Sequence, residues 1–155
     1  MKIRYATRND IPAMLELGRG IHAESRFADM PYDEAKLREG LGELIHLQEQ
    51  AGSHCFLVAE SGDARIVGGF IGALETYFFT RATSANSILI WVDPAWRGSS
   101  AAMRMIDAFR RWAAQRQASE VCLLVASGVT IKRTDRFFRR LGFVQTGGNY
   151  SMAIT

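Results

Sequence analysis

The chain has 155 residues, of which 48% are hydrophobic and 23% charged, and these globular proportions exclude long disordered stretches. Three prolines and two cysteines exclude collagen-like, proline-rich and disulfide-stapled classes, and no window approaches the roughly 18 apolar residues of a membrane helix. The net charge of +3 is uneven, because residues 1–96 carry 9 Lys/Arg against 13 Asp/Glu, whereas residues 97–155 carry 10 against 3. We expect one domain over residues 1–155, located in the cytoplasm, whose basic half meets a phosphorylated cofactor or a nucleic acid.

The first half of the chain predicts strands and two helices. Ile3 and Tyr5 alternate with polar residues as in a strand, and Asp10 followed by Pro12 is typical of a helix start. Residues 22–31 lack periodicity and predict a loop. Apolar spacing then predicts a helix over 33–50 and strands over 55–60 and 65–79. Glycines in the last of these strands indicate a bulge or a close backbone contact: Gly68, Gly69 and Gly72.

The second half begins with a polar connection over 81–86 and a strand over 87–92. A helix follows from Ser99 or Ser100 to about residue 117, with its buried stripe made of Ala102, Met105, Ile106, Phe109, Trp112 and Ala113 and an ion pair between Asp107 and Arg111 on its solvent side. The apolar run 121–125 predicts a strand covered on both faces, and Gly142 ends a helix over 130–141. Residues 143–144 and 150–154 predict two closing strands.

The two cysteines and three histidines offer no metal site. Cys55 and Cys122 each lie in an apolar run, which favours buried, reduced thiols over nucleophiles. No histidine stands at metal-ligand spacing from another ligand. We therefore expect neither a metal nor a covalent cysteine mechanism.

The segment that most clearly indicates a binding function follows residue 92, where a predicted strand ends at Asp93-Pro94 and small residues lead into a helix. Unpaired N–H groups and the helix dipole at such a turn favour a diphosphate, provided that the side chains are small. The small residues are Gly98, Ser99, Ser100, Ala101 and Ala102, with Arg97 and Arg104 at the rim. An ordinary helix cap is the alternative interpretation of the same pattern.

This segment resembles the cofactor motif of the GCN5-related N-acetyltransferase (GNAT) family, Q/R-x-x-G-x-G/A after a strand ending in V-x-P. Val92-Asp93-Pro94, Arg97 and Ala102 match it, whereas Ser100 replaces the central glycine. A second match is residues 137–143, FFRRLGF, against the family's F-Y-x-x-L-G-F. The resemblance spans nearly the whole chain and implies a mixed α/β fold, with a mostly antiparallel sheet of six to seven strands flanked by about four helices.

The resemblance also implies acetyl transfer from acetyl-coenzyme A (acetyl-CoA) to a primary amine by direct attack in a ternary complex. Strands 87–92 and 121–125 would splay apart to admit the pantetheine arm. Ile90, Trp91 and Val92 would bind that arm, and the Val92 N–H would polarise the thioester carbonyl. Arg97 to Ala102, with Arg104, would hold the diphosphate.

The family's general base and acid are missing from their usual places. Asn86 and Ser87 stand where many members have a glutamate, and Phe138 replaces the tyrosine acid. Glu75 is the substitute base and Tyr150 the substitute acid, although an exposed strand-end charge and a buried packing tyrosine are the alternatives for these two residues.

The segment 22–27 corresponds to the family's acceptor-binding region. Glu24 would attract a cationic amine, and Phe27 or Tyr32 would wall the site; solvated loop residues are the alternative. The partner is then a small-molecule or protein amine, with no membrane, and a homodimer is an option. Two rival functions remain, a non-catalytic acyl-CoA-binding domain and, ranked below it, a nucleic-acid-binding module.

Overall fold

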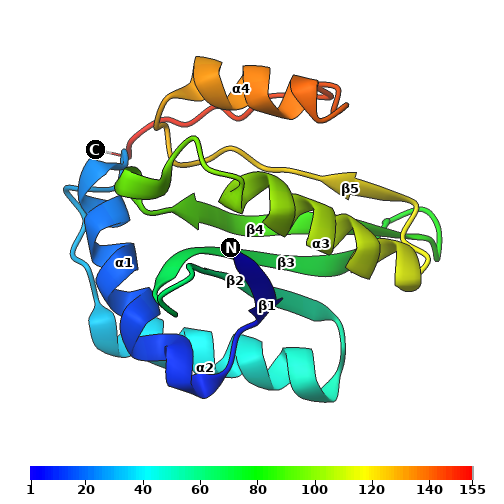
Figure 1. The fold of residues 1–155 in the computed structure, drawn as a ribbon. Coiled ribbons are helices and arrows are strands. Elements are labelled where there is room, and N and C mark those ends of the chain that lie inside the picture. The colour runs from blue at the N-terminus through cyan, green and yellow to red at the C-terminus, as the bar shows by residue number, and fades with distance from the viewer. Residues whose placement is uncertain (155) are drawn as a thin grey trace.

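The structure, a computed structural model, describes residues 1–154 as one five-stranded sheet with helices on both faces (Figure 1). The strands lie in the order β1-β2-β3-β4-β5; the first four are antiparallel, and β5 runs parallel to β4. The helices are α1 (Ile11–Glu24), α2 (Glu34–Gln50), α3 (Ala101–Gln115) and α4 (Ile131–Arg140). The strands are β1 (Lys2–Tyr5), β2 (His54–Glu60), β3 (Ile66–Thr76), β4 (Thr83–Val92) and β5 (Glu120–Cys122), and two short 3-10 turns are η1 (Arg8–Asp10) and η2 (Pro94–Trp96).

Alternation along β2 builds two hydrophobic layers. Cys55, Leu57 and Ala59 face α3, whereas Phe56 and Val58 face α1 and α2. Successive strand residues point to opposite faces, so a strand that is covered on both faces is apolar throughout. The predicted mixed α/β class with about four helices is confirmed, and none of the described helices is long and apolar enough to cross a membrane.

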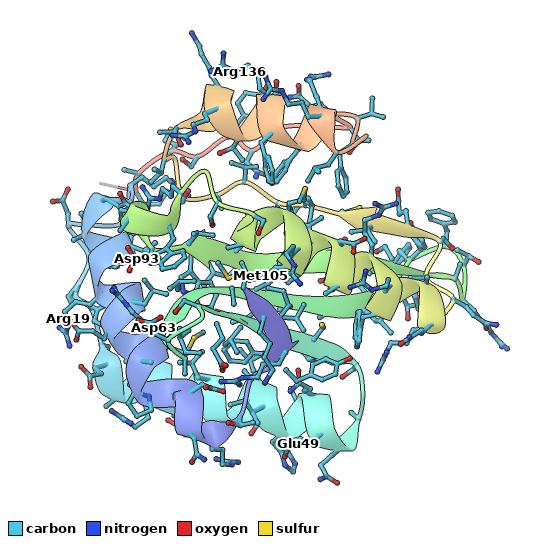
Figure 2. The ribbon with its side chains drawn as sticks, viewed as in Figure 1. Arg19, Glu49, Asp63, Asp93, Met105 and Arg136 are labelled. Carbon is cyan, nitrogen blue, oxygen red and sulfur yellow. The ribbon has the colours of Figure 1, made fainter. Side chains whose placement is uncertain are left out.

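Helix α3 is the best-packed helix of the molecule. Five residues of its predicted stripe are buried: Met105, Ile106, Phe109, Trp112 and Ala113. Ala102 is only half-buried, and Ala101 occupies the buried position instead. Figure 2 shows Met105 between α3 and the sheet, while Arg136 points outward from α4. The predicted pair of Asp107 and Arg111 forms on the exposed face.

The glycines of β3 allow large rings to lie against the backbone. A Cβ on Gly69 would lie 2.3 Å from the Trp91 ring, and one on Gly72 would lie 2.4 Å from the Phe109 ring. The register between β3 and β4 also shifts between Ile71 and Gly72. In the pairing with β2, Val67 is the extra residue, so both of the predicted alternatives, a bulge and a close backbone contact, are present in this strand.

The two parallel strands diverge after three residue pairs. β4 and β5 pair only over 84–86 and 120–122, and no strand pairing continues beyond this point in the described chain. The buried Ser87 hydroxyl accepts a hydrogen bond from the Leu124 N–H at 2.8 Å, at the point where pairing stops. We call this divergence of β4 from the chain after β5 the fork, with Ser87 at its root and Val92 at its mouth.

The predicted closing strands are absent, so the sheet has five strands rather than six to seven. Residues 143–154 form no strand, and Tyr150, Met152 and Ile154 have 86–98% of their surface exposed. Their alternating pattern suits a strand, but a strand also needs a partner, and no residue of the described chain pairs with them. Helix α4 contacts the α3 layer through Phe137, Phe138 and Leu141, which are only partly buried.

Four predicted boundaries were wrong at the edges of the fork. α1 continues to Glu24 through residues expected to be a loop, and β4 begins at Thr83 rather than at Ser87. β3 ends at Thr76 instead of about Phe79, and β5 covers only Glu120–Cys122. The expectation that 121–125 is covered on both faces fails, since Leu124 is 54% exposed. Strand pairing, which apolar pattern alone does not reveal, sets the limits of the three strands.

Candidate active site

A turn between β4 and α3 shapes the small-residue loop. Asp93 caps η2, accepting a hydrogen bond from the Ala95 N–H at 2.9 Å, and the chain then passes through Gly98 at φ +92°. Ser100, by contrast, has φ −76°. The left-handed position that favours glycine is therefore Gly98, and serine at position 100 causes no backbone strain.

Some N–H groups of this loop are hydrogen-bonded within it and others have no partner in the described chain. The Ser99 N–H bonds to the Trp96 carbonyl, and the Ala101 N–H bonds to the Ser99 hydroxyl. Within residues 1–154 no hydrogen-bond partner is found for the N–H groups of Gly98, Ser100 and Ala102. Such free amides at the start of a 15-residue helix form the kind of site that binds an anion.

Three arginines are close to the loop, two of them along the chain and one in space. Arg97 forms a bidentate ion pair with Glu24, and its Nε lies 3.3 Å from the Val92 carbonyl oxygen. Arg133 of α4, which the sequence did not single out, lies beside Gly98, with its Nη2 3.9 Å from where a Cβ would stand. Arg104 instead donates to the Met1 carbonyl. Arg97 and Arg133 therefore flank the loop, and Arg104 is engaged with the N-terminus.

Beyond residue 86, the edge of β4 that faces the fork is not paired to another strand of the described chain. The Asp93 N–H bonds to Val67 of β3 at 2.9 Å, and adjacent strand residues direct their backbone groups to opposite edges. Ile90 and Val92 therefore present theirs to the fork. The Trp91 side chain is buried in the layer under α1 and α2.

Glu75 lies at the root of the fork, far from Val92. Its Oε2 accepts a hydrogen bond from Asn86 Nδ2 at 2.8 Å, and it is exposed. Val92 stands six positions after Asn86, which corresponds to about 20 Å of strand. The structure therefore does not bring the predicted base and the predicted oxyanion donor to the same carbonyl group.

Other polar side chains surround Glu75 on the same face of the sheet. The Tyr77 hydroxyl donates to Glu120, and this bond holds the pKa of Tyr77 above its ordinary value. Burial, followed by the charge of Glu120, raises the pKa of the half-buried Cys122. Burial raises the pKa of Cys55 to about 12. Both thiols stay protonated at neutral pH, as expected of thiols that do not act as nucleophiles.

The acceptor-region residues divide into two groups. Glu24, the last residue of α1, pairs with Arg97 at the mouth of the fork, and Phe27 lies in the following turn, with the Arg26 guanidinium over its ring. Between them, Arg26 donates from its Nε to the Ala126 carbonyl and from its backbone to Ser127. Tyr32 points elsewhere, since its hydroxyl donates to the Leu15 carbonyl at 2.8 Å and its ring lies against His22. Burial raises its pKa.

The structure does not bring Tyr150 into the site. Its side chain is 98% exposed, so the alternative of a packing tyrosine is also wrong. Phe138 packs with Phe137 and Phe143, and it offers no proton.

Three residues at the site were not assigned a role from sequence: Ser87, Arg26 and Arg133. No local pattern indicates any of them, because each acts on a segment distant in the chain. The positive charge of residues 97–155 was the one signal that pointed toward Arg133.

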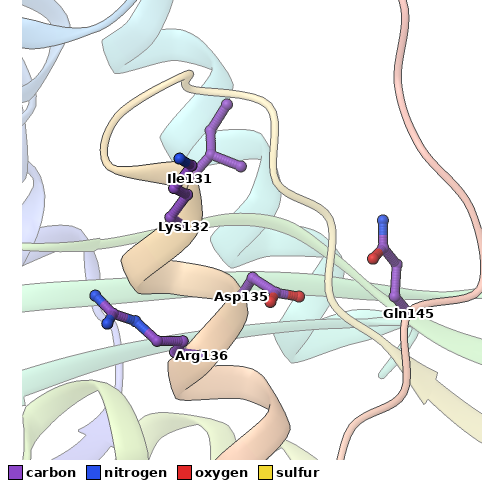
Figure 3. Close-up of a pocket in the computed structure, with 5 residues that line it drawn as sticks. All are labelled: Ile131, Lys132, Asp135, Arg136 and Gln145. Atoms are coloured by element: carbon purple, nitrogen blue, oxygen red, sulfur yellow. The ribbon is translucent and has the colours of Figure 1, made fainter.

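A hollow of about 460 Å³ lies on α4 outside the fork (Figure 3). Ile131, Lys132, Asp135 and Arg136 line it, with Gln145 across from them. None of these residues belongs to the loop at Gly98 or to the fork, and Arg133 is not among them.

Comparison with known families places the chain. Residues 52–145 match the model of an acetyltransferase (GNAT) domain, a range that includes β2 to α4 and therefore the fork. The chain belongs to the GNAT family. The resemblance seen in the two sequence motifs is thereby confirmed, and members of this family are acetyltransferases that take acetyl-CoA as co-substrate.

Solved structures share the fold of this GNAT chain at low identity. A transcriptional regulator from Bacillus halodurans C-125 superposes with TM-score 0.78 at 18% identity, over 99% of both chains. An aminoglycoside antibiotic 6'-N-acetyltransferase from Acinetobacter haemolyticus gives 0.73 at 22%, over 100% of this chain and 99% of that one. A ribosomal-protein-alanine N-acetyltransferase from Brucella melitensis biovar Abortus 2308 gives 0.71 at 17%, over 99% and 100%. A search of curated protein sequences gave no match.

Proposed function

We propose that this protein is a cytoplasmic N-acetyltransferase that moves the acetyl group of acetyl-CoA to a primary amine of a small molecule or a protein. The observation that carries the proposal is the fork, which opens directly beside the free amides of Gly98, Ser100 and Ala102. The domain proposed for this activity is the whole chain, residues 1–155.

The loop fits the diphosphate of the co-substrate. Its free N–H groups, the left-handed Gly98 and the small side chains leave room for phosphate oxygens, and Arg97 and Arg133 supply positive charge on either side. Ile90 and Val92 would bind the pantetheine arm through the backbone groups that face the fork, in the way that the edge of a strand hydrogen-bonds to an extended peptide. Acetyl-CoA supplies the activated thioester.

The position of the thioester decides which residues act. If the pantetheine arm runs from the loop toward the root, the thioester carbonyl lies near Ser87 and Ile88. Glu75 is then the proposed base, and a backbone N–H from that part of β4 polarises the carbonyl. If the carbonyl lies at the mouth, the Val92 N–H is the donor and Glu75 is too distant. A lysine-like amine has a pKa near 10.4, so a base or a water relay has to remove its proton in either case.

The leaving thiolate does not require a tyrosine to protonate it. A thiol of pKa near 8.5 leaves unaided more readily than an alkoxide, whereas a general acid adds roughly 10²–10⁴-fold. We therefore expect slow turnover, because Phe138 cannot donate a proton and Tyr150 is exposed. The same observation favours the second candidate, a non-catalytic acyl-CoA-binding domain.

Thermal unfolding with acetyl-CoA separates these two candidates from any unrelated function. At about 100 times its dissociation constant, a ligand stabilises the folded chain by ~2.7 kcal/mol. We expect a clear rise in Tm, followed by thiol release with at least one member of a panel of amines. No rise removes both candidates, and a rise without thiol release for any amine leaves the binding domain.

Substitution of Ala102 tests the loop. Ala102→Glu places a carboxylate beside the diphosphate, so it should abolish the rise in Tm. Ala114→Glu, near the other end of α3 and exposed, is the matched control and should retain it. Retained binding in a folded Ala102→Glu variant contradicts the loop as the site.

Substitution of Glu75 distinguishes the two positions of the thioester. Glu75→Gln should lower kcat by about 10²-fold and leave coenzyme A affinity unchanged if the carbonyl lies at the root. Glu49→Gln, an exposed change on α2, is the control. An unchanged kcat dismisses Glu75 and favours the mouth.

A further inference from the structure

The end of α1 lies across the mouth of the fork. Glu24, its last residue, pairs with Arg97, which follows β4. Two residues later, Arg26 bonds to the carbonyls of Ala126 and Ser127, which follow β5, at 2.9 and 3.0 Å. Figure 1 shows this end of α1 beside η2 and the loop before α4. We call residues 24–26 the strap.

The two attachments of the strap differ in kind. Arg26 is held to backbone carbonyls, and its guanidinium also donates to the Ser151 hydroxyl at 3.1 Å. None of these groups belongs to the proposed phosphate site. Glu24, in contrast, occupies the guanidinium of Arg97, which is part of that site, and both side chains are about one-third exposed.

A phosphate bound at the loop would compete with Glu24 for Arg97. Both present paired oxygens to the same planar set of N–H donors, and a guanidinium binds either in bidentate fashion. The Arg97 Nε contact with the Val92 carbonyl keeps the guanidinium beside the end of β4 in the meantime. Displacement of Glu24 by phosphate leaves a free carboxylate beside the mouth.

We infer that the Glu24–Arg97 pair is a latch: coenzyme A phosphate takes Arg97 and releases Glu24 to receive the ammonium group of the acceptor. Acceptor binding then follows co-substrate binding. Because the phosphate has to displace Glu24 from Arg97, the same pair weakens coenzyme A binding in the free protein. The inference rests on the proposed function and assigns Glu24 a role in binding the acceptor amine.

Coenzyme A titration by calorimetry tests the latch in four proteins: wild type, Glu24→Gln, Arg97→Gln and the double variant. Glu24→Gln should tighten binding about two- to fivefold, the range expected for breaking a partly exposed ion pair. Arg97→Gln should weaken binding about tenfold or more. In the Arg97→Gln background, Glu24→Gln should change affinity less than about twofold, because the pair is already broken.

A matched control removes one negative charge elsewhere on the same helix. Glu16→Gln, exposed on α1, should leave coenzyme A affinity within about twofold of wild type. Circular dichroism and Tm of each variant verify folding. Equal affinity of Glu24→Gln and wild type overturns the latch, and so does an equal gain in the Arg97→Gln background or in Glu16→Gln.

Kinetics with the best amine of the panel tests the released carboxylate. Glu24→Gln should raise KM for the amine more than it lowers kcat, since the lost charge acts on binding. An unchanged KM overturns the second half of the inference. Absence of coenzyme A binding to the wild-type protein is a different result, because it refutes the proposed function itself.

Discussion

The two sides of the fork differ in how they are built. β4 is paired to β3 along its length; Ala85 is buried in the layer under α3 and Trp91 in the layer under α1 and α2, whereas Ile88 and Leu89 between them are about half exposed. β5 has three residues, and neither it nor the chain after it contains a buried residue, since Ala113 is the last one in the described chain. The packed half supplies stability, and the lightly packed half supplies charge and the second side of the site. A binding fork with one rigid and one weakly held side can admit a ligand without disturbing the core.

The largest change in stability is expected when an aromatic ring is removed from the packed side of the fork. Phe109 is fully buried, and its ring centroid lies 5.3 Å from that of Trp112 and 4.5 Å from that of Phe70. Phe109→Ala should lower the free energy of unfolding by about 3–5 kcal/mol, because the cavity it leaves cannot collapse. Urea denaturation measures the loss.

The matched change on the other side is Phe137→Ala in α4. Its ring is only partly buried, so the expected loss is about 1 kcal/mol. Comparable losses for Phe109→Ala and Phe137→Ala would abolish the distinction between the two halves.

The second test concerns the close contact under β4. Gly69→Ala would place a Cβ 2.3 Å from the Trp91 ring, so the ring or the strand has to move. Overpacking of this kind costs about 1–3 kcal/mol. Gly147→Ala, where nothing lies within 4 Å, should have almost no effect in the same thermal melt. Equal Tm values for the two variants would mean that the contact is not rigid.

The third test uses pH on the packed half. Arg4 donates two hydrogen bonds of 2.8 Å to Asp10, and they hold the pKa of Asp10 below its ordinary 3.8. The lowered pKa in the folded chain stabilises it fully above pH 3.8 and progressively less as the pH falls through the lowered value. Asp10→Asn should therefore cost about 1–2 kcal/mol at pH 7 and little in strong acid.

Urea unfolding of wild type and Asp10→Asn across pH measures this difference. The exposed Asp29→Asn is the control and should follow the wild-type curve. A gap between wild type and Asp10→Asn that persists unchanged into strong acid contradicts the assignment to Arg4.

The smallest effect is expected at the root of the fork. Ser87→Ala removes the acceptor of the Leu124 N–H, and the loss in unfolding free energy should be about 1 kcal/mol. Hydrogen exchange gives a sharper readout, because the Leu124 amide should exchange faster while amides of β2 and β3 do not change. Ser119→Ala, exposed before β5, serves as control. Unaltered exchange at Leu124 would show that Ser87 does not join the two sides.

The sequence was most informative where structure is local. Helical spacing identified all but one residue of the stripe of α3, and the glycines of β3 indicated a bulge or a close contact, both of which are present. It was least informative at the C-terminal end, where an alternating pattern over 150–154 predicted a strand that does not form. An alternating pattern predicts which face of a strand would be apolar. The segment forms a strand only where a neighbouring strand pairs with its backbone.

The sequence by itself determined the family and the chemistry of the 97–100 loop, because small residues after a strand and before a helix expose amides wherever that turn occurs. The tertiary structure alone decided that Glu24 pairs with Arg97, 73 positions away, and that about 20 Å of strand separates Asn86, the partner of Glu75, from Val92. These relations depend on how α1 packs on the sheet and on where β4 and β5 cease to pair. Neither is encoded in a local spacing, since contacts between distant segments arise from the packing of the whole core.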